Sequence, residues 1–65
     1  MFILEYENLG LFVKWEHNSF SLTEYKEEAC TFSRPPVENY LAFIDRCLIK
    51  TDPYYKLGKL NSVSN

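Results

Sequence analysis

Histidine and cysteine are the side chains of this sequence with the most versatile chemistry, and His17, Cys30 and Cys47 are the only ones present. They are too few and too scattered for a structural zinc site, which takes four ligands at close spacings. A thiolate nucleophile needs a base that a third group orients within a cleft, and nothing in the sequence orients His17. Cys47 follows the apolar positions of a predicted helix, where a free cysteine behaves as a small hydrophobic residue. We therefore expect no metal, no cofactor and no catalysis.

Three glutamates, Glu24, Glu27 and Glu28, form the densest acidic group of the sequence. Paired carboxylates can perform acid–base chemistry, but this spacing places all three on the outer face of a predicted helix. A solvated helix surface is the simpler interpretation. Its functional alternative is electrostatic, because an acidic face can present carboxylates where a nucleic-acid-binding protein would hold phosphates.

Aromatic residues are abundant, with one tryptophan, five tyrosines and five phenylalanines in 65 residues. A chain this short buries only about 60% of the surface that its unfolded form exposes, so we expect some rings to remain outside the core. Tryptophan and tyrosine are enriched at protein–protein contacts. The predicted contact residues are Phe12, Trp15, Phe20, Phe43, Tyr54 and Tyr55, with Glu24, Glu27 and Glu28 as a charged rim.

The elements that position these residues begin with a predicted β-hairpin. Side chains alternate between apolar and polar over about residues 2–7 and again over 10–16, the period-2 pattern of half-buried strands. Asn8 and Gly10 between them tolerate the positive φ of a tight turn. We predict an antiparallel hairpin at the N-terminal end of the sequence.

Two helices are predicted to pack on this hairpin. Ser21 and Glu24 have the spacing of a capping box, which predicts a helix over about residues 22–32. Prolines end it, and Pro36 can open a second helix over about 36–50, whose wide apolar arc would contact both the sheet and the first helix. Asp52 and the proline after it predict a short helical turn over 53–57.

The whole sequence has the size and composition of one small α+β domain over residues 1–60, with a frayed polar tail over 61–65. The two halves differ in charge: residues 1–30 carry six acids and two lysines, whereas residues 31–65 carry five basic and three acidic residues. No basic leader or long apolar run is present, and two cysteines are far below the density of a secreted mini-protein. We expect a cytoplasmic location with reduced thiols.

These observations favour a non-catalytic protein–protein interaction module, an inhibitor, adaptor or antitoxin-like regulator that binds a protein partner through an aromatic and acidic surface. Small domains of this kind are common among viral and mobile-element proteins, an analogy from size and composition. Marginal core size also favours a homodimer. The alternative is a helix-turn-helix regulator that binds nucleic acid with the basic second half, which the low net positive charge disfavours.

Overall fold

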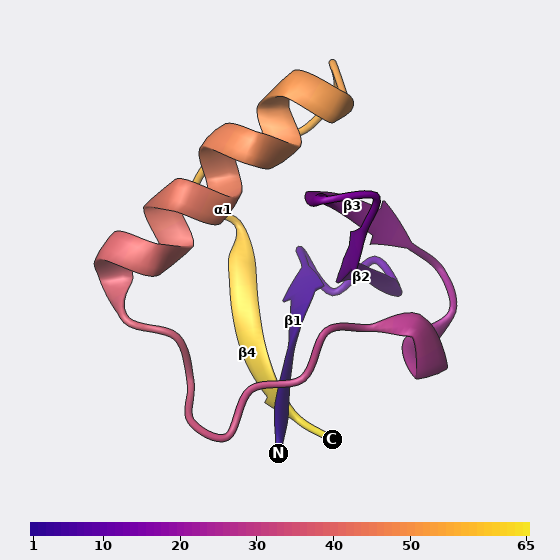
Figure 1. Cartoon of the computed structure of the whole chain (residues 1–65), viewed down its shortest axis with the longest axis vertical. Coiled ribbons are helices and arrows are strands. Elements are labelled where there is room, and N and C mark those ends of the chain that lie inside the picture. Colours follow the sequence, from indigo (N-terminus) through magenta and orange to yellow (C-terminus); the bar gives the residue numbers. More distant parts are fainter.

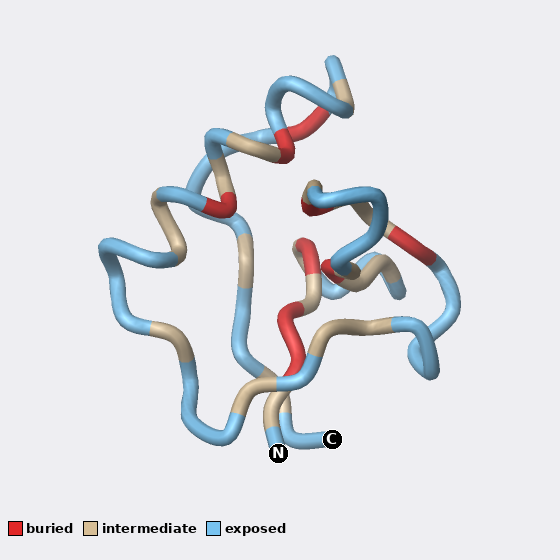
Figure 2. Tube along the Cα trace, in the orientation of Figure 1, coloured by how far each residue is buried: buried red, intermediate tan, exposed pale blue.

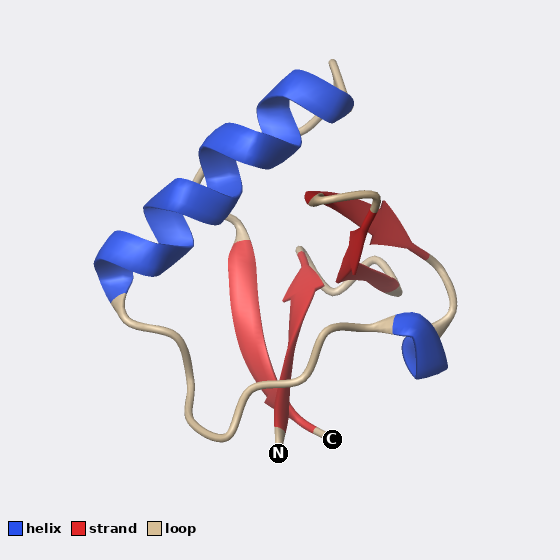
Figure 3. Cartoon of the chain, viewed as in Figure 1, coloured by secondary structure: helices blue, strands red, loops and turns tan.

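A computed structural model describes all residues of the chain, 1–65, and its N-terminal half is built from three successive strands (Figures 1 and 3). Strands β1 (Phe2–Tyr6) and β2 (Leu11–Glu16) form the predicted antiparallel hairpin. Strand β3 (Ser19–Thr23) then pairs with β2 from Phe12–Thr23 to Glu16–Ser19. With strand β4 (Leu60–Ser64) the sheet is antiparallel throughout, in the order β3-β2-β1-β4. The α+β class and the hairpin are thus confirmed.

The first predicted helix, over residues 22–32, is wrong. Leu22 and Thr23 belong to β3, and the only helical turn in this region is the 3₁₀ segment η1 (Lys26–Glu28). His17 and Asn18 have φ values of 55° and 59°, as in two-residue hairpin turns, so they fold the chain back into a third strand. With only one α-helix in the structure, the two adjacent helices of a helix-turn-helix are not formed.

After η1, an extended segment of the chain lies between β1 and β2, where these two strands diverge. These two strands pair only at Glu5–Phe12 and Tyr6–Leu11 before they separate. The amide of Cys30 donates a hydrogen bond to the carbonyl of Val13 (3.0 Å), and Phe2 and Phe32 exchange two backbone hydrogen bonds (2.7 and 2.8 Å). Figure 1 shows this segment crossing the lower end of β1 on its way to the helix. The segment fixes Phe32 beside the sheet.

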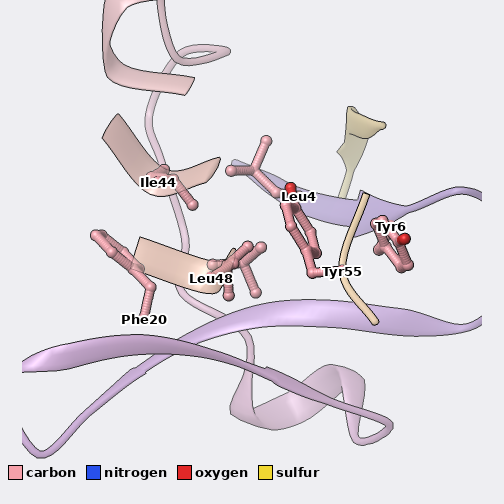
Figure 4. Packing of buried hydrophobic residues seen from close by; sticks show 7 residues of the cluster. Leu4, Tyr6, Phe20, Ile44, Leu48 and Tyr55 are labelled. Carbon is pink, nitrogen blue, oxygen red and sulfur yellow. The ribbon is translucent and has the colours of Figure 1, made fainter. Parts of the chain in front are cut away.

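Helix α1 (Glu38–Thr51) is the second predicted helix and begins two residues later than expected, because Val37 is still extended. It lies over one face of the sheet and packs mainly on β3. Ile44 and Leu48 of α1 are fully buried against the sheet (Figures 2 and 4). The buried core cluster consists of Leu4, Tyr6, Val13, Phe20, Ile44, Leu48 and Tyr55.

The C-terminal segment differs from the prediction twice. Residues 61–65 are not a frayed tail, because β4 pairs along all of β1, from Tyr6–Leu60 to Phe2–Ser64. The boundary expected at residue 60 therefore falls at the start of a sheet strand. Residues 53–57 contain no helix, and the turn at residues 53–54 is held by the Asp52 side chain, which accepts a hydrogen bond from the Tyr54 amide (2.9 Å).

Candidate protein-binding surface

The tip of the β2–β3 hairpin places one exposed and one buried ring against each other. Trp15 lies directly opposite Phe20 across the two strands, and their ring centroids are 4.8 Å apart in an edge-on arrangement. Phe20 is 2% exposed, whereas Trp15 is 53% exposed. The indole therefore rests on a ring of the core and keeps half of its surface open to a partner.

Helix α1 adds two more rings to the same site. Tyr40 and Phe43 are three residues apart, so they project from the same side of the helix and stack at 6.0 Å. Each ring centroid also lies 6.3 Å from that of Phe20, at a steep interplanar angle. Tyr40 remains 41% exposed and Phe43 remains 45% exposed. Like Trp15, both rings rest on Phe20 without being covered.

Phe32 completes the group from the extended segment, with its ring 6.2 Å from that of Tyr40. Its backbone is fixed by the paired hydrogen bonds to Phe2. We call these five rings, which touch in one continuous network, the aromatic surface: Trp15, Phe20, Phe32, Tyr40 and Phe43. They come from β2, β3, α1 and the segment before α1, and Figure 1 shows how these elements are arranged.

The aromatic surface is open because the helix expected beside α1 is absent. The wide apolar arc of α1 suits two neighbours, a sheet and a second helix, but the structure provides only the sheet. Tyr40 and Phe43 lie on the flank of that arc that is left without a neighbouring helix. Tyr40 and Phe32 were not among the predicted contact residues, since the sequence places both on buried helix faces. The width of the arc was the signal that could have identified Tyr40.

The other predicted contact residues are distributed over different parts of the molecule. Phe12 is half-buried on the opposite face of the sheet, because it alternates with Leu11 and Val13, which pack in or against the core. Glu24, Glu27 and Glu28 are exposed in and just before η1.

Glu28 does not form part of an acidic rim around the aromatic surface. Its carboxylate accepts a hydrogen bond from the Thr23 hydroxyl (2.7 Å) and lies 3.9 Å from Lys14 Nζ. The side chain of Lys14 points away from the sheet face that carries Trp15, since neighbouring strand residues alternate. Glu28 and the aromatic surface are therefore on opposite faces, so Glu28 is separated from the rings that it was predicted to accompany.

Tyr54 and Tyr55, which the sequence treats alike, have opposite environments. Tyr54 is 88% exposed in the turn after α1. Tyr55 is buried, and its ring stacks on that of Tyr6 at 4.8 Å between β1 and α1 (Figure 4). The Tyr55 hydroxyl donates a hydrogen bond to Asp45, and the Tyr6 hydroxyl accepts one from the Lys56 amide (2.9 Å). We call this the tyrosine anchor, because it attaches the loop before β4 to the core.

Burial is the main cause that raises the pKa of the Tyr55 hydroxyl above its ordinary value, followed by the hydrogen bond to Asp45 and repulsion from its carboxylate. A neutral hydroxyl can donate to the carboxylate, whereas a phenolate would face a second negative charge. The other oxygen of Asp45 accepts a hydrogen bond from the Gly58 amide (3.3 Å). These contacts are consistent with a structural role for the pair.

The reactive side chains are not brought together. Burial raises the pKa of the Cys30 thiol, which disfavours the nucleophilic thiolate, and Cys30 and Cys47 are both free and half-buried. His17 is exposed at the hairpin tip, with Nε2 3.5 Å from Glu16. No three side chains of the His, Cys, Asp and Glu types lie close enough together to hold a metal ion. One open groove of about 260 Å³ lies between α1 and the start of β4.

Comparison of the chain with protein-family models, with curated proteins and with solved structures found no match. None of the helices in the structure combines the length and the apolar character needed to cross a membrane. The inference of function therefore depends on the surface of the molecule itself, and the aromatic surface is its most distinctive part.

Proposed function

We propose that this chain is a non-catalytic interaction module that binds a protein partner through the aromatic surface. The observation that carries the proposal is that Trp15, Tyr40 and Phe43 are each about half exposed while they rest on one buried ring, Phe20. Exposed aromatic residues grouped in this way are typical of the residues that dominate the binding energy of protein interfaces.

The packing of these rings favours binding because it limits their freedom before a partner arrives. Each exposed ring contacts at least one other ring, so binding costs little additional side-chain conformational entropy. The Trp15 indole N–H and the Tyr40 hydroxyl add polar groups that can orient a partner. A partner with a complementary apolar patch and a few hydrogen-bonding groups would bury this surface.

The role that fits such a module is that of an inhibitor, adaptor or antitoxin-like regulator, since each acts only by covering a surface of its partner. An origin in a virus or mobile element belongs to the same proposal and is supported by size and composition alone. The aromatic surface is the contact in all these roles. Glu28 is not required for it, because its carboxylate lies on the other side of the sheet beside Thr23 and Lys14.

The test compares proteins captured from native cells by three forms of the chain. These are the wild type, the double variant Trp15→Ala with Phe43→Ala, and Tyr54→Ala. Tyr54 is the matched control because it is the most exposed ring and makes no ring contact. We expect the wild type and Tyr54→Ala to retain the same partner and the double variant to lose it. Against the purified partner, the double variant should bind at least about 30-fold more weakly, as for a hot spot worth 2 kcal/mol.

Circular dichroism of the double variant checks that the sheet and helix are retained. A correctly folded double variant that keeps the partner would refute the proposal. Loss of the partner by Tyr54→Ala alone would refute it as well, because the binding site would then lie in the turn after α1.

A further inference from the structure

Strand β4 has one edge paired with β1 and one edge that pairs with nothing. The Lys59 carbonyl accepts a hydrogen bond from the Glu7 amide (3.0 Å), and the Asn65 amide donates one to the Met1 carbonyl (2.9 Å). Backbone amides and carbonyls alternate in direction along a strand, so those of the odd-numbered residues of this segment point toward β1. The amides and carbonyls of Leu60, Ser62 and Ser64 therefore point outward, and no residue of the chain hydrogen-bonds to them.

This free edge lacks the features with which proteins usually prevent strand pairing. Natural edge strands carry charged residues, prolines or bulges that block an incoming strand. Strand β4 has the sequence LNSVS, with no charge and no proline, and it pairs with β1 residue by residue without a bulge. Ser62 and Ser64 are exposed. The edge is therefore ready to accept another strand.

We propose that β4 is the interface of a homodimer, in which it pairs antiparallel with β4 of a second copy about a two-fold axis through Ser62. In this register Ser62 lies opposite Ser62 of the second copy, and Leu60 lies opposite Ser64. Each facing pair exchanges two N–H···O bonds, so every outward backbone group of β4 finds a partner. The two four-stranded sheets become one continuous sheet.

A second copy is the occupant that this edge fits best, because the edge is complementary to itself. The register that matches all the outward donors and acceptors of one β4 with those of the other is symmetric, as an isologous dimer requires. No charges oppose each other along the strands, and the facing serines are small. A strand from a different protein could form the same backbone hydrogen bonds, but β4 offers no side chains that would select that strand over others.

The groove beside β4 supplies apolar surface for the same contact. Leu41 and Ala42 of α1 and Leu60 form its apolar part, at the point where the register places Ser64 of the second copy, and the rest of its lining is Glu38, Asp45 and Gly58. Covering this groove would bury apolar area that a chain of 65 residues cannot cover itself. The aromatic surface involves β3, at the other edge of the sheet, so dimerisation leaves it open.

The experiment is sedimentation equilibrium at micromolar concentrations with the wild type, Ser62→Pro and Ser62→Lys. Proline at position 62 removes an outward amide and no bond to β1, which is the position where sheets tolerate proline. We expect the wild type to approach twice the mass of one chain and both variants to remain at the mass of one chain. Ser62→Lys places a like charge opposite itself and keeps the test valid if the proline variant does not fold. The double variant Trp15→Ala with Phe43→Ala is the control and should dimerise as the wild type does.

Amide hydrogen exchange gives a second measurement that a dimer of another kind would not reproduce. The amides of Leu60, Ser62 and Ser64 should be protected at concentrations where the dimer forms and exchange rapidly on dilution. A monomeric wild type overturns the proposal, and so does a folded Ser62 variant that still dimerises. Dimerisation that the aromatic double variant abolishes would overturn it too, because self-association would then use the aromatic surface.

Discussion

Two aromatic pairs in this protein have the same separation and different environments. The rings of Tyr6 and Tyr55 are 4.8 Å apart, as are those of Trp15 and Phe20. In the first pair both rings are buried and both hydroxyls are hydrogen-bonded. In the second pair only Phe20 is buried, and Trp15 makes no hydrogen bond through its side chain. Ring distance alone therefore does not distinguish a structural pair from a binding pair, whereas burial and polar partners do.

The comparison shows how a small chain rich in aromatic residues can divide them between two tasks. The tyrosine anchor closes the molecule, because it attaches the loop after α1 to β1 and α1 through ring packing and hydrogen bonds. The aromatic surface leaves three rings uncovered over a single buried one. If this division is correct, substitutions in the anchor should lower stability and substitutions in the exposed rings should mainly lower binding.

The largest expected effect is that of Tyr55→Ala. Removal of a buried ring leaves a cavity and a carboxylate without its hydroxyl partner, so the free energy of unfolding should fall by about 4 kcal/mol. Chemical denaturation monitored by circular dichroism measures this change. The adjacent Tyr54→Ala should change stability by less than about 0.5 kcal/mol, because that ring is exposed. Similar losses in both variants would contradict the distinction between anchor and surface.

A smaller effect should appear when only the Tyr55 hydroxyl is removed. Tyr55→Phe keeps the ring but loses the hydrogen bond to Asp45, which should cost about 1.5 kcal/mol near neutral pH. The wild type should then lose its stability advantage over Tyr55→Phe at alkaline pH. Because folding raises the pKa of Tyr55, its stabilisation is complete below the unfolded-state pKa of about 10 and is lost as pH rises beyond it.

The slope of that loss is about 1.4 kcal/mol per pH unit until the folded-state pKa is reached. Denaturation of the wild type and Tyr55→Phe between neutral and alkaline pH measures it as a difference between the two proteins. A difference that does not change with pH would show that the Tyr55 hydroxyl titrates normally in the folded state.

The smallest effect on stability is expected for Trp15→Ala. This change removes one edge-on contact with Phe20 and a partly buried ring, so the cost should be about 1 kcal/mol. Chemical denaturation measures it alongside Tyr55→Ala. A loss of unfolding free energy as large as that of Tyr55→Ala would show that Trp15 belongs to the core. The proposed binding surface would then consist of Tyr40 and Phe43 alone.

Local patterns in the sequence predict the hairpin and α1, because each depends on residues close in the chain. The alternation over residues 2–16 and the helical spacing that includes Ile44 and Leu48 correspond to the observed buried faces. The capping-box pattern at Ser21 also depends only on neighbouring residues, and it wrongly predicted the start of a helix. Thr23, two residues later, fulfils a related role: its hydroxyl oxygen accepts a hydrogen bond from the Tyr25 amide (3.1 Å), and the strand continues until that point.

Strand β4 could not be predicted in this way, since its partner β1 lies at the other end of the chain. Its asparagine and serines have low strand propensity, and they are held in the sheet by pairing with Glu5, Leu4 and Phe2 of β1. The aromatic surface was predicted in part. Trp15, Phe20 and Phe43 were identified from residue type, but only the fold shows that Phe20 is the buried base and that Tyr40 and Phe32 join them.

The pairing of β1 with β4 has a consequence for how this protein is made. β1 is synthesised before β4 and keeps one edge unpaired until Ser64 has been added, so the four-stranded sheet cannot be completed before that point. Contacts between distant parts of a chain also slow folding. We therefore expect folding to finish only after translation has passed β4, with the hairpin and α1 forming earlier and waiting for the final strand.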